Sequence, residues 1–567
     1  MGRDKEIKVK VRNLIIVLAG IVLANVLVQL HVFRWDLTDD KLYSLSDASK
    51  NLLDQTDAPI EATVLLNGDL SAGFKRLRKA TIETLEEMRV YAHGIRIDYL
   101  DLNTLDNKAR QEMEQKGFIP TRNTIVEHSG KTVEIRTYPY VILRYHDKEA
   151  IVNLLSGAGQ TEEEVTNAGI EQLEYNLLEP LYLMQRSSTP RVAILEGHDE
   201  AEEQYTYDLE KTLSDYFQVD RGSINGEGVD LHILDDYQAI IIANPQSSFG
   251  EAERYIIDQY IMRGGKVLWA VDGVRFSNDM LHTEGFTPII EHEIGIKDML
   301  FRYGICIDPA LVQDVQCLKI PVQAPSSSKQ SHVLIPWTYA PLLQSNPYHP
   351  ITHDIGAIMS TFVSPIRAVN DEDGIEKFVL LYTSTATKVT RCPNEVNLSG
   401  NEQDWNSYEY ANVPVAASME GVFPSVYAHR MMPEGVIANE PVIKQSTPTR
   451  QIVIGSGSVL MNNANQNQIQ AIGFDPVTGR LYSNRDFITN AMLWLTDEDG
   501  LIRLREKIIP LRMLNTKRAY QERTKVELIS IICPIAVLAL IGGMVFVIRK
   551  RKYALKVESG KLKVERR

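Results

Sequence analysis

The sequence predicts an α/β protein in which two transmembrane helices flank an extracytoplasmic region of two domains. An apolar stretch of membrane-spanning length lies near each end, and between them strands rich in β-branched residues alternate with amphipathic helices. The composition, with 44% apolar and 24% charged residues, is typical of globular proteins. At 567 residues, the chain is too long for a single hydrophobic core.

The two apolar stretches are residues 13–33 and 528–548. Each is long enough to cross a hydrocarbon layer of about 30 Å at about 1.5 Å per helical residue. A cleaved signal peptide is the alternative for the first, but its apolar region would be shorter, and no A-x-A cleavage site follows. A buried core helix is the alternative for the second, but the basic run at 549–552 ends it abruptly. We therefore expect two membrane anchors.

Charge predicts the orientation of the chain. The first 12 residues include five basic and two acidic ones, and the tail after Ile548 has nine basic and two acidic ones. Because basic segments stay in the cytoplasm, both termini should be cytoplasmic and the bulk of the chain should be periplasmic, on a bacterial inner membrane. The net charge of the chain is −14, which leaves about −24 between the anchors. A region with so large a negative charge repels phosphate groups. The charge therefore argues against nucleic-acid binding by the part of the chain between the anchors.

The first exterior domain should be a small α/β domain with a β-α-β-α pattern. The expected elements are a helix at 45–53, a strand at 60–66, a helix at 74–91, a strand at 95–102 and a helix at 106–116. A hairpin-like stretch at 131–153 and a helical bridge at 161–184 follow. A thioredoxin-like arrangement fits this order, although without a C-x-x-C motif it could not carry out dithiol chemistry.

The second exterior domain should be a doubly wound parallel sheet. The expected strands at 191–196, 238–243 and 266–271 alternate with helices at 201–217 and 251–263. Strands at 377–383 and 451–455 would complete this sheet, and a helix is expected at 486–495. Residues 321–329 and 394–407 are predicted to be exposed loops.

Polar residues follow the first three strands of this sheet. Because the carboxyl ends of parallel strands share one edge, where ligands usually bind, these residues predict a polar crevice. The candidate ligand-binding residues are Gly197, His198, Asp199, Glu200, Asn244 and Asp272. The alternative is that these residue types only build the turns between strands and helices.

Several kinds of chemistry are not supported by the sequence. There is no G-x-x-x-x-G-K-[ST] motif for ATP hydrolysis, and the turn at 455–458 does not fit a nucleophile elbow. Asn244 and Pro245 occupy the strand-to-helix turn where a cysteine nucleophile would lie. The cysteines have neither C-x-x-C nor zinc spacing, although a disulfide between Cys306 and Cys317 remains an alternative. We expect neither a cofactor nor a metal site, and Pro350 argues against a metal pair at His349 and His353.

Four segments resemble the GldG family: residues 34–53, 192–200, 257–274 and 485–507. This family is described as the auxiliary, substrate-binding component of an ABC transporter in gliding bacteria. The resemblance covers nearly the whole chain and implies a partner permease and a separate ATPase, in a complex associated with gliding motility and secretion. It also implies a glutamine-amidotransferase-like domain without the catalytic cysteine, a kind of domain proposed to bind carbohydrate. The turn at 455–458 departs from the family because it lacks an acidic residue, which argues against an ion or sugar role there.

These observations predict the following organisation. The expected parts are a cytoplasmic tail (1–12), a transmembrane helix (13–33), a small α/β domain (34–185), an amidotransferase-like α/β domain (186–511), a linker (512–527), a transmembrane helix (528–548) and a basic cytoplasmic tail (549–567).

The leading hypothesis is a non-enzymatic subunit of an ABC transporter that binds a ligand or an envelope protein in the periplasm. A second hypothesis is an envelope hydrolase that uses His198, Asp199, Glu200 and Asp272 as acid and base. A third is a structural scaffold of the motility apparatus, in which the crevice would be closed or filled.

Overall fold

The computed structural model describes most of the chain between residues 44 and 564. The described residues are 44–126, 132–155, 161–226, 228–323, 332–353, 355–369, 374–398, 407–437, 440–465, 468–496, 502 and 523–564. The predicted first membrane helix therefore lies outside them. The chain divides into two units, Met1–Ile509 and Pro510–Arg567, and the first is a mixed α/β structure with several sheets.

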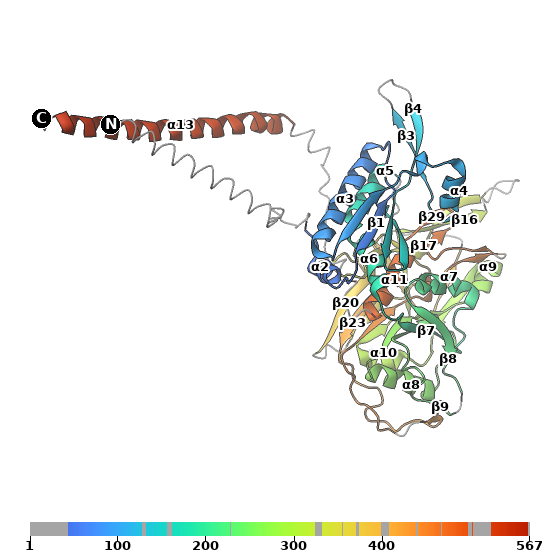
Figure 1. Cartoon of the computed structure of the whole chain (residues 1–567). Coiled ribbons are helices and arrows are strands. Elements are labelled where there is room, and N and C mark those ends of the chain that lie inside the picture. The colour runs from blue at the N-terminus through green and yellow to red at the C-terminus, as the bar shows by residue number, and fades with distance from the viewer. Residues whose placement is uncertain are drawn as a thin grey trace. The chain divides into compact units, whose positions relative to one another are not determined.

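The first unit begins with a four-stranded sheet in the order β2-β1-β5-β6 (Figure 1). The pairing of β1 with β2 is parallel, and those of β1 with β5 and of β5 with β6 are antiparallel. The elements here are α2 (Asp47–Asp54), β1 (Ile60–Val64), α3 (Ala72–Tyr91), β2 (Ile95–Tyr99), α4 (Asn107–Gln115), β3 (Thr121–Val126), β4 (Thr132–Thr137), β5 (Tyr140–Tyr145), β6 (Lys148–Asn153), α5 (Glu162–Glu171) and α6 (Leu173–Gln185).

The predicted β-α-β-α order of this region is confirmed, and two details are wrong. The stretch at 131–153 is not one hairpin, because β4 pairs with β3 and only β5 and β6 pair with each other. The helical bridge at 161–184 is two helices that meet at Gln172. Helix α3 forms as expected because Phe74, Leu77 and Leu85 line one buried face at helical spacing.

A ten-stranded sheet forms the centre of the following region. Its main path is β16-β17-β20-β23-β25-β11-β10-β7-β8, and β18 pairs with β17. The elements along the chain are β7 (Arg191–Glu196), α7 (Glu203–Ser214), β8 (Gln218–Ser223), β10 (Ala239–Ala243), α8 (Glu251–Met262), β11 (Lys266–Ala270), β16 (Cys317–Gln323), β17 (His332–Ser345), β18 (Ile358–Met359), β20 (Ile375–Tyr382), β23 (Pro414–Gly421), β25 (Thr449–Ile454) and α11 (Asn484–Thr496).

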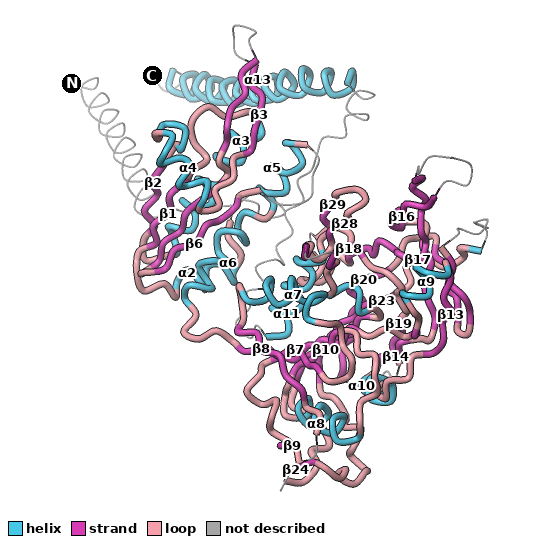
Figure 2. Tube along the Cα trace, turned by 90° about the vertical axis from the view of Figure 1, so that its right-hand side faces the viewer, coloured by secondary structure: helices cyan, strands magenta, loops and turns pink. Residues whose placement is uncertain are grey.

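The parallel half of this sheet is covered on both faces. Alternate residues of β7 point to opposite sides: Val192 joins the cluster that contains α7 and α11, and Ala193 joins the one that contains α8. Strand β10 is buried throughout, as its continuous apolar sequence predicts for a parallel strand between two helical layers. Figure 2 shows β8, β7 and β10 side by side.

The prediction of a wholly parallel sheet is wrong. Strands β8, β7, β10, β11 and β25 are parallel, but β23, β20, β17 and β16 continue the sheet with antiparallel pairings. The expected strands at 377–383 and 451–455 do join the sheet, as β20 and β25. Two predicted loops are also partly wrong, because 321–323 belongs to β16 and Asn394–Asn397 forms β22. The rest of both loops lies largely outside the described residues.

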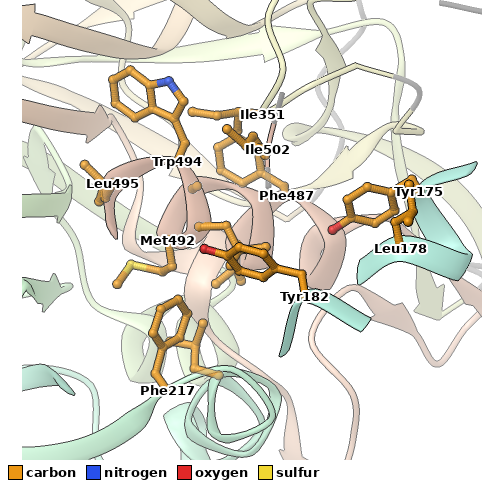
Figure 3. Close-up of a cluster of buried hydrophobic side chains, with 14 of the residues drawn as sticks. Tyr175, Leu178, Tyr182, Phe217, Ile351, Phe487, Met492, Trp494, Leu495 and Ile502 are labelled. Atoms are coloured by element: carbon orange, nitrogen blue, oxygen red, sulfur yellow. The ribbon is translucent and has the colours of Figure 1, made fainter. Parts of the chain in front are cut away.

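Helix α6 and helix α11 share one apolar cluster. Figure 3 shows Tyr175, Leu178 and Tyr182 of α6 gathered with residues of α11. Phe487, Met492, Trp494 and Leu495 of α11 take part, together with Phe217, Ile351 and Ile502. The same cluster includes Ile60 of the four-stranded sheet and Ile194 of the large sheet, so the two sheets share a continuous core.

The second unit contains helix α13 (Arg523–Val564). Its segment Glu527–Arg551 is 25 residues long with a mean hydropathy of 2.8, and none of it is buried. Among the described residues, it is the one helix long and apolar enough to cross a membrane. The predicted second membrane helix is therefore present as a helix of the right length and composition.

Candidate functional site

The carboxyl ends of the parallel strands meet along one edge, which we call the crest. Three main-chain hydrogen bonds join them: Asn244 N–H to Ala270 O at 2.8 Å, Val271 N–H to Ile454 O at 3.0 Å, and Ala201 N–H to Ala243 O at 3.2 Å. The crest comprises residues 197–200 after β7, 244–248 after β10, 272–273 after β11 and 455–458 after β25. The structure thus brings all six predicted site residues to one edge, as expected for parallel strands.

Left-handed backbone conformations shape the turns of the crest. Gly197 has a φ of 114°, and Asp199 and Asn244 have φ values of 53° and 57°. A side chain on Gly197 would be strained at this φ, and its Cβ would lie 2.4 Å from Nδ2 of Asn225, so glycine is favoured there. Aspartate and asparagine tolerate this conformation better than most residues. The backbone thus accounts for the residue types at all three positions.

His198 is buried between two carboxylates. Its side chain is 2% exposed, with Nδ1 lying 3.1 Å from Oε1 of Glu200 and Nε2 lying 3.0 Å from Oε2 of Glu253. The ring also stacks on Phe249, with a centroid distance of 3.6 Å. Burial alone would lower the pKa of His198, but the hydrogen bonds to both carboxylates outweigh it and leave this pKa above its usual value. Both ring nitrogens are therefore engaged within the protein.

Asp272 is buried beneath the crest. It is 5% exposed, and its Oδ1 accepts a hydrogen bond of 2.9 Å from Gly457 N–H. Burial raises the pKa of Asp272 to about 7. Asn244 packs on the same glycine, where a Cβ would lie 2.3 Å from the Asn244 Cβ. Gly457 therefore brings the ends of β10, β11 and β25 into contact.

The part of the crest above β11 and β25 is covered by residues 361–364, which we call the strap. The carbonyl oxygen of Thr361 accepts hydrogen bonds of 3.0 Å from the hydroxyls of Ser456 and Ser458. Ser364 N–H donates to Gly455 O at 2.8 Å, and the Ser364 hydroxyl accepts from Gly273 N–H at 3.1 Å. These contacts leave the end of β25 and Asp272 buried.

The other part of the crest, above β7 and β10, remains accessible. Gly197, Asp199 and Gln246 are exposed there, and Asn244 and Ser247 are half-buried. We call these five residues the open part of the crest. Its polar groups contact each other: the Ser247 hydroxyl bonds the Asp199 carboxylate, and Gln246 Nε2 donates to Asn244 Oδ1 at 2.9 Å. It offers amide, hydroxyl and carboxylate groups and no cationic side chain.

Sequence reasoning missed three residues that organise the crest. Glu253 and Phe249 hold the His198 ring, and His292 contacts Asp272 O through Nδ1 at 3.2 Å. Glu253 could have been found, because a glutamate three residues after Gly250 fits a capping pattern at the start of α8, and its carboxylate accepts from Gly250 N–H. His292 lies in a loop 20 residues after Asp272, and no local pattern points to it.

The remaining candidate groups form no metal or disulfide site. Within the described part of the chain, no group of three His, Cys, Asp or Glu side chains is placed to hold a metal ion. The imidazole of His353 contacts Pro347 O at 3.1 Å, and that of His349 lies 3.3 Å from the Ser418 hydroxyl. Cys306 and Cys317 are free thiols, so the alternative of a disulfide between them is not borne out.

The fold and the crest define a mixed α/β protein with a polar strand edge and a helix of membrane-spanning length. Residues 189–491 match a family model for the auxiliary component of an ABC-type uncharacterized transport system. The chain belongs to that family. The protein is thus an auxiliary component of an ABC-type transport system, which implies association with transporter components and agrees with association with a membrane.

Other comparisons add little. Residues 39–144 match a domain of unknown function (DUF7088). No curated protein matches the chain. One similar solved structure, titled "mmIFT52 N-terminal domain", has 15% identity and a TM-score of 0.31, over 55% of this chain and 98% of that chain. A likeness that weak supports no conclusion about fold or function.

Proposed function

We propose that this protein is a non-enzymatic, GldG-like subunit of an inner-membrane ABC transport complex that binds a ligand or an envelope partner at the open part of its crest. The match of residues 189–491 to the transport family is the observation that carries this proposal. Because the sequence has no P-loop motif, energy would come from a separate ATPase, which acts with a permease. Gliding motility and the secretion that it requires are the proposed setting.

The proposed topology is two-pass, with both termini in the cytoplasm. The unburied apolar segment Glu527–Arg551 supports one anchor, and residues 13–33 would form the other. Residues 34–185 and 186–511 would then be periplasmic. The strand order β2-β1-β5-β6 supports a thioredoxin-like description of the first region. The five parallel strands between two helical layers support an amidotransferase-like description of the second.

The chemistry of the open part favours binding of a neutral, hydroxyl-rich ligand such as a carbohydrate. Its carboxylate, amides and hydroxyl can each donate to or accept from ligand hydroxyls. The strongly acidic charge of the region between the anchors disfavours anionic ligands. Of the six candidate residues, Gly197, Asp199 and Asn244 would face the ligand. His198, Glu200 and Asp272 would support them from below.

Two alternatives rank lower. A hydrolase would need an accessible acid and base, but Asp272 and His198 are buried and His198 has both nitrogens bonded. A structural scaffold is the second candidate function. The closure of half the crest by the strap favours it, because a scaffold needs no crevice.

Co-purification tests the proposal. A tag on the tail after Ile548 is used to isolate the protein from detergent-solubilised membranes, and its companions are identified by mass spectrometry. A permease and an ATPase in fixed ratio are the expected result. A variant without residues 523–567, tagged at the N-terminus, is the control for the contribution of α13. Recovery of the protein alone, or only with envelope enzymes, would refute the transporter-subunit proposal.

A further inference from the structure

We propose that His198 is a pH-responsive clamp that fixes the open part of the crest by joining the turn after β7 to the loop that leads into α8. It would act as a positioning residue and would not touch the ligand. The clamp rests on the contacts of His198 within the protein, and its pH response rests on the hydrogen bonds of the ring to two carboxylates. Its effect on ligand binding rests on the function proposed above.

The first line of evidence is the set of bonds that converge on this residue. The main-chain oxygen of His198 accepts hydrogen bonds from Gln246 N–H at 2.9 Å and from Ser247 N–H at 2.8 Å. Its main-chain N–H donates to Oε2 of Glu200 at 2.6 Å. One residue thus holds both sides of the open part, because Gln246 and Ser247 form one side and Asp199 the other.

The second line of evidence is the surroundings of the ring. Nδ1 faces Glu200 from the same turn, Nε2 faces Glu253 from α8, and the face of the ring stacks on Phe249. Those two carboxylates are the charged groups that act on His198. The nearby Asp199 carboxylate accepts instead from the Ser247 hydroxyl.

The contacts with Glu200 and Glu253 favour two ring protons. When both carboxylates are ionised they only accept hydrogen bonds, and both ring nitrogens can then donate only as the imidazolium. Neutral imidazole would leave one nitrogen lone pair against a carboxylate oxygen, and Glu200 and Glu253 would no longer be joined by a cation. Loss of the proton should therefore loosen the link between the two loops.

The direction of the pH effect follows from the same contacts. The pKa of His198 lies above its ordinary value in the folded protein because the hydrogen bonds to Glu200 and Glu253 outweigh burial. A raised histidine pKa stabilises the fold fully at acidic pH, and that contribution is lost as the pH rises through the raised value. The open part should be ordered in mildly acidic surroundings and looser in alkaline ones.

Hydrogen exchange of the full-length protein in detergent tests the clamp without any ligand. Peptides that cover 197–203 and 244–250 are followed at pH 6.0 and pH 8.5, after correction for intrinsic exchange rates. Protection of both peptides should fall by about tenfold at the higher pH, since hydrogen bonds to charged groups are among the stronger ones. Equal protection at both pH values would overturn the proposal.

Two variants and a control sharpen the test. His198→Gln should show low protection of both peptides at both pH values. The conservative Glu253→Gln should keep the fold but lose most of the pH dependence of protection, because a carboxamide can donate a hydrogen bond to the neutral ring. His282→Gln, at an exposed histidine of α9 (Asn278–Glu284), should behave as wild type. Retention of the wild-type pH dependence in both clamp variants would also overturn the proposal.

The clamp and the proposed function can fail separately. The exchange experiment reports on the clamp whether or not a permease is recovered. Co-purification reports on the complex at a single pH, whatever the exchange result. A glycan array probed at pH 6.0 and pH 8.5 tests whether the clamp affects ligand binding. We expect glycan binding to weaken at pH 8.5 in wild type but not in Glu253→Gln. The same pH dependence of binding in both proteins would show that the clamp does not control it.

Discussion

Asp272 illustrates how burial governs single residues of the crest. Its carboxyl accepts from Gly457 N–H, lies at the end of a central strand and has a pKa raised to about 7 by burial. In the unfolded chain the same carboxyl ionises near pH 4. Between these values the folded protein holds a proton that the unfolded chain has lost, so ionisation of this group reduces stability as the pH rises.

Asp272→Asn should therefore stabilise the protein at alkaline pH. An asparagine keeps the acceptor for Gly457 N–H and cannot ionise. We expect the stability advantage of the variant to grow by about 2 to 3 kcal/mol between pH 5 and pH 8. Urea denaturation of the full-length protein at both pH values measures it, with Asp147→Asn at an exposed turn as the matched control. An advantage independent of pH would show that Asp272 does not titrate in this range.

A second residue-scale prediction concerns the buried carboxylate of Asp208 in α7. Arg485 at the start of α11 donates from Nε to Asp208 Oδ2 at 2.8 Å, and Ile472 N–H donates to the same oxygen at 2.8 Å. The Asp208 side chain is 7% exposed and that of Arg485 is 39% exposed.

Arg485→Ala should cost about 2 to 3 kcal/mol of unfolding free energy, less than for a fully buried pair because water partly screens the arginine. Chemical denaturation provides the measurement, and the exposed Lys211→Ala in the same helix α7 should stay within about 0.5 kcal/mol of wild type. A loss no larger than that of Lys211→Ala would mean that the pair contributes little.

At the scale of elements, the contact between α6 and α11 joins the two sheets. Nearly all of α11 is buried, and α6 contributes aromatic and aliphatic side chains to the same cluster (Figure 3). One core continues from the four-stranded sheet to the large sheet, so damage at this contact should affect both.

Leu178→Ala in α6 tests this coupling. The side chain is fully buried, so its truncation should cost about 2 to 4 kcal/mol through lost burial and a cavity. The expected signature is a single unfolding transition, shifted as a whole, when tryptophan fluorescence and far-UV circular dichroism are compared. Ile119→Ala, at a residue that is 70% exposed, is the control for truncation of a large apolar side chain. Two separate transitions in the variant would show that the two sheets unfold independently.

At the scale of the whole molecule, the two apolar segments are the proposed membrane anchors. Segment Glu527–Arg551 is unburied, and residues 13–33 have a matching composition. If each is an anchor, removal of either one should leave the protein in the membrane pellet after alkaline carbonate extraction, and removal of both should release it. Immunoblots of pellet and supernatant measure this. Release by the C-terminal deletion alone would refute the N-terminal anchor.

Some of the fold and of the crest could be predicted from local patterns. The strands β7, β10 and β11 were found within one residue at each end, because their continuous apolar sequences are bounded by turn residues. The placement of Asn244 and Asp272 on one edge followed from the rule that parallel strands end on the same side of a sheet. Antiparallel β23 was missed because its sequence, PVAASMEG, has only one β-branched residue. The edge strand β8 was missed because its residues are exposed or half-buried, so no apolar pattern marks it.

The sequence by itself determined the α/β class, the C-terminal helix of membrane-spanning length and the identity of the strand ends that form the crest. These features depend on periodicity, length and turn chemistry, which are local. Only the tertiary structure decided that His198 is held by Glu253, that the strap closes half of the crest and that Asp272 lies beneath it. Each of these depends on residues 55 or more positions apart, which no local pattern brings together.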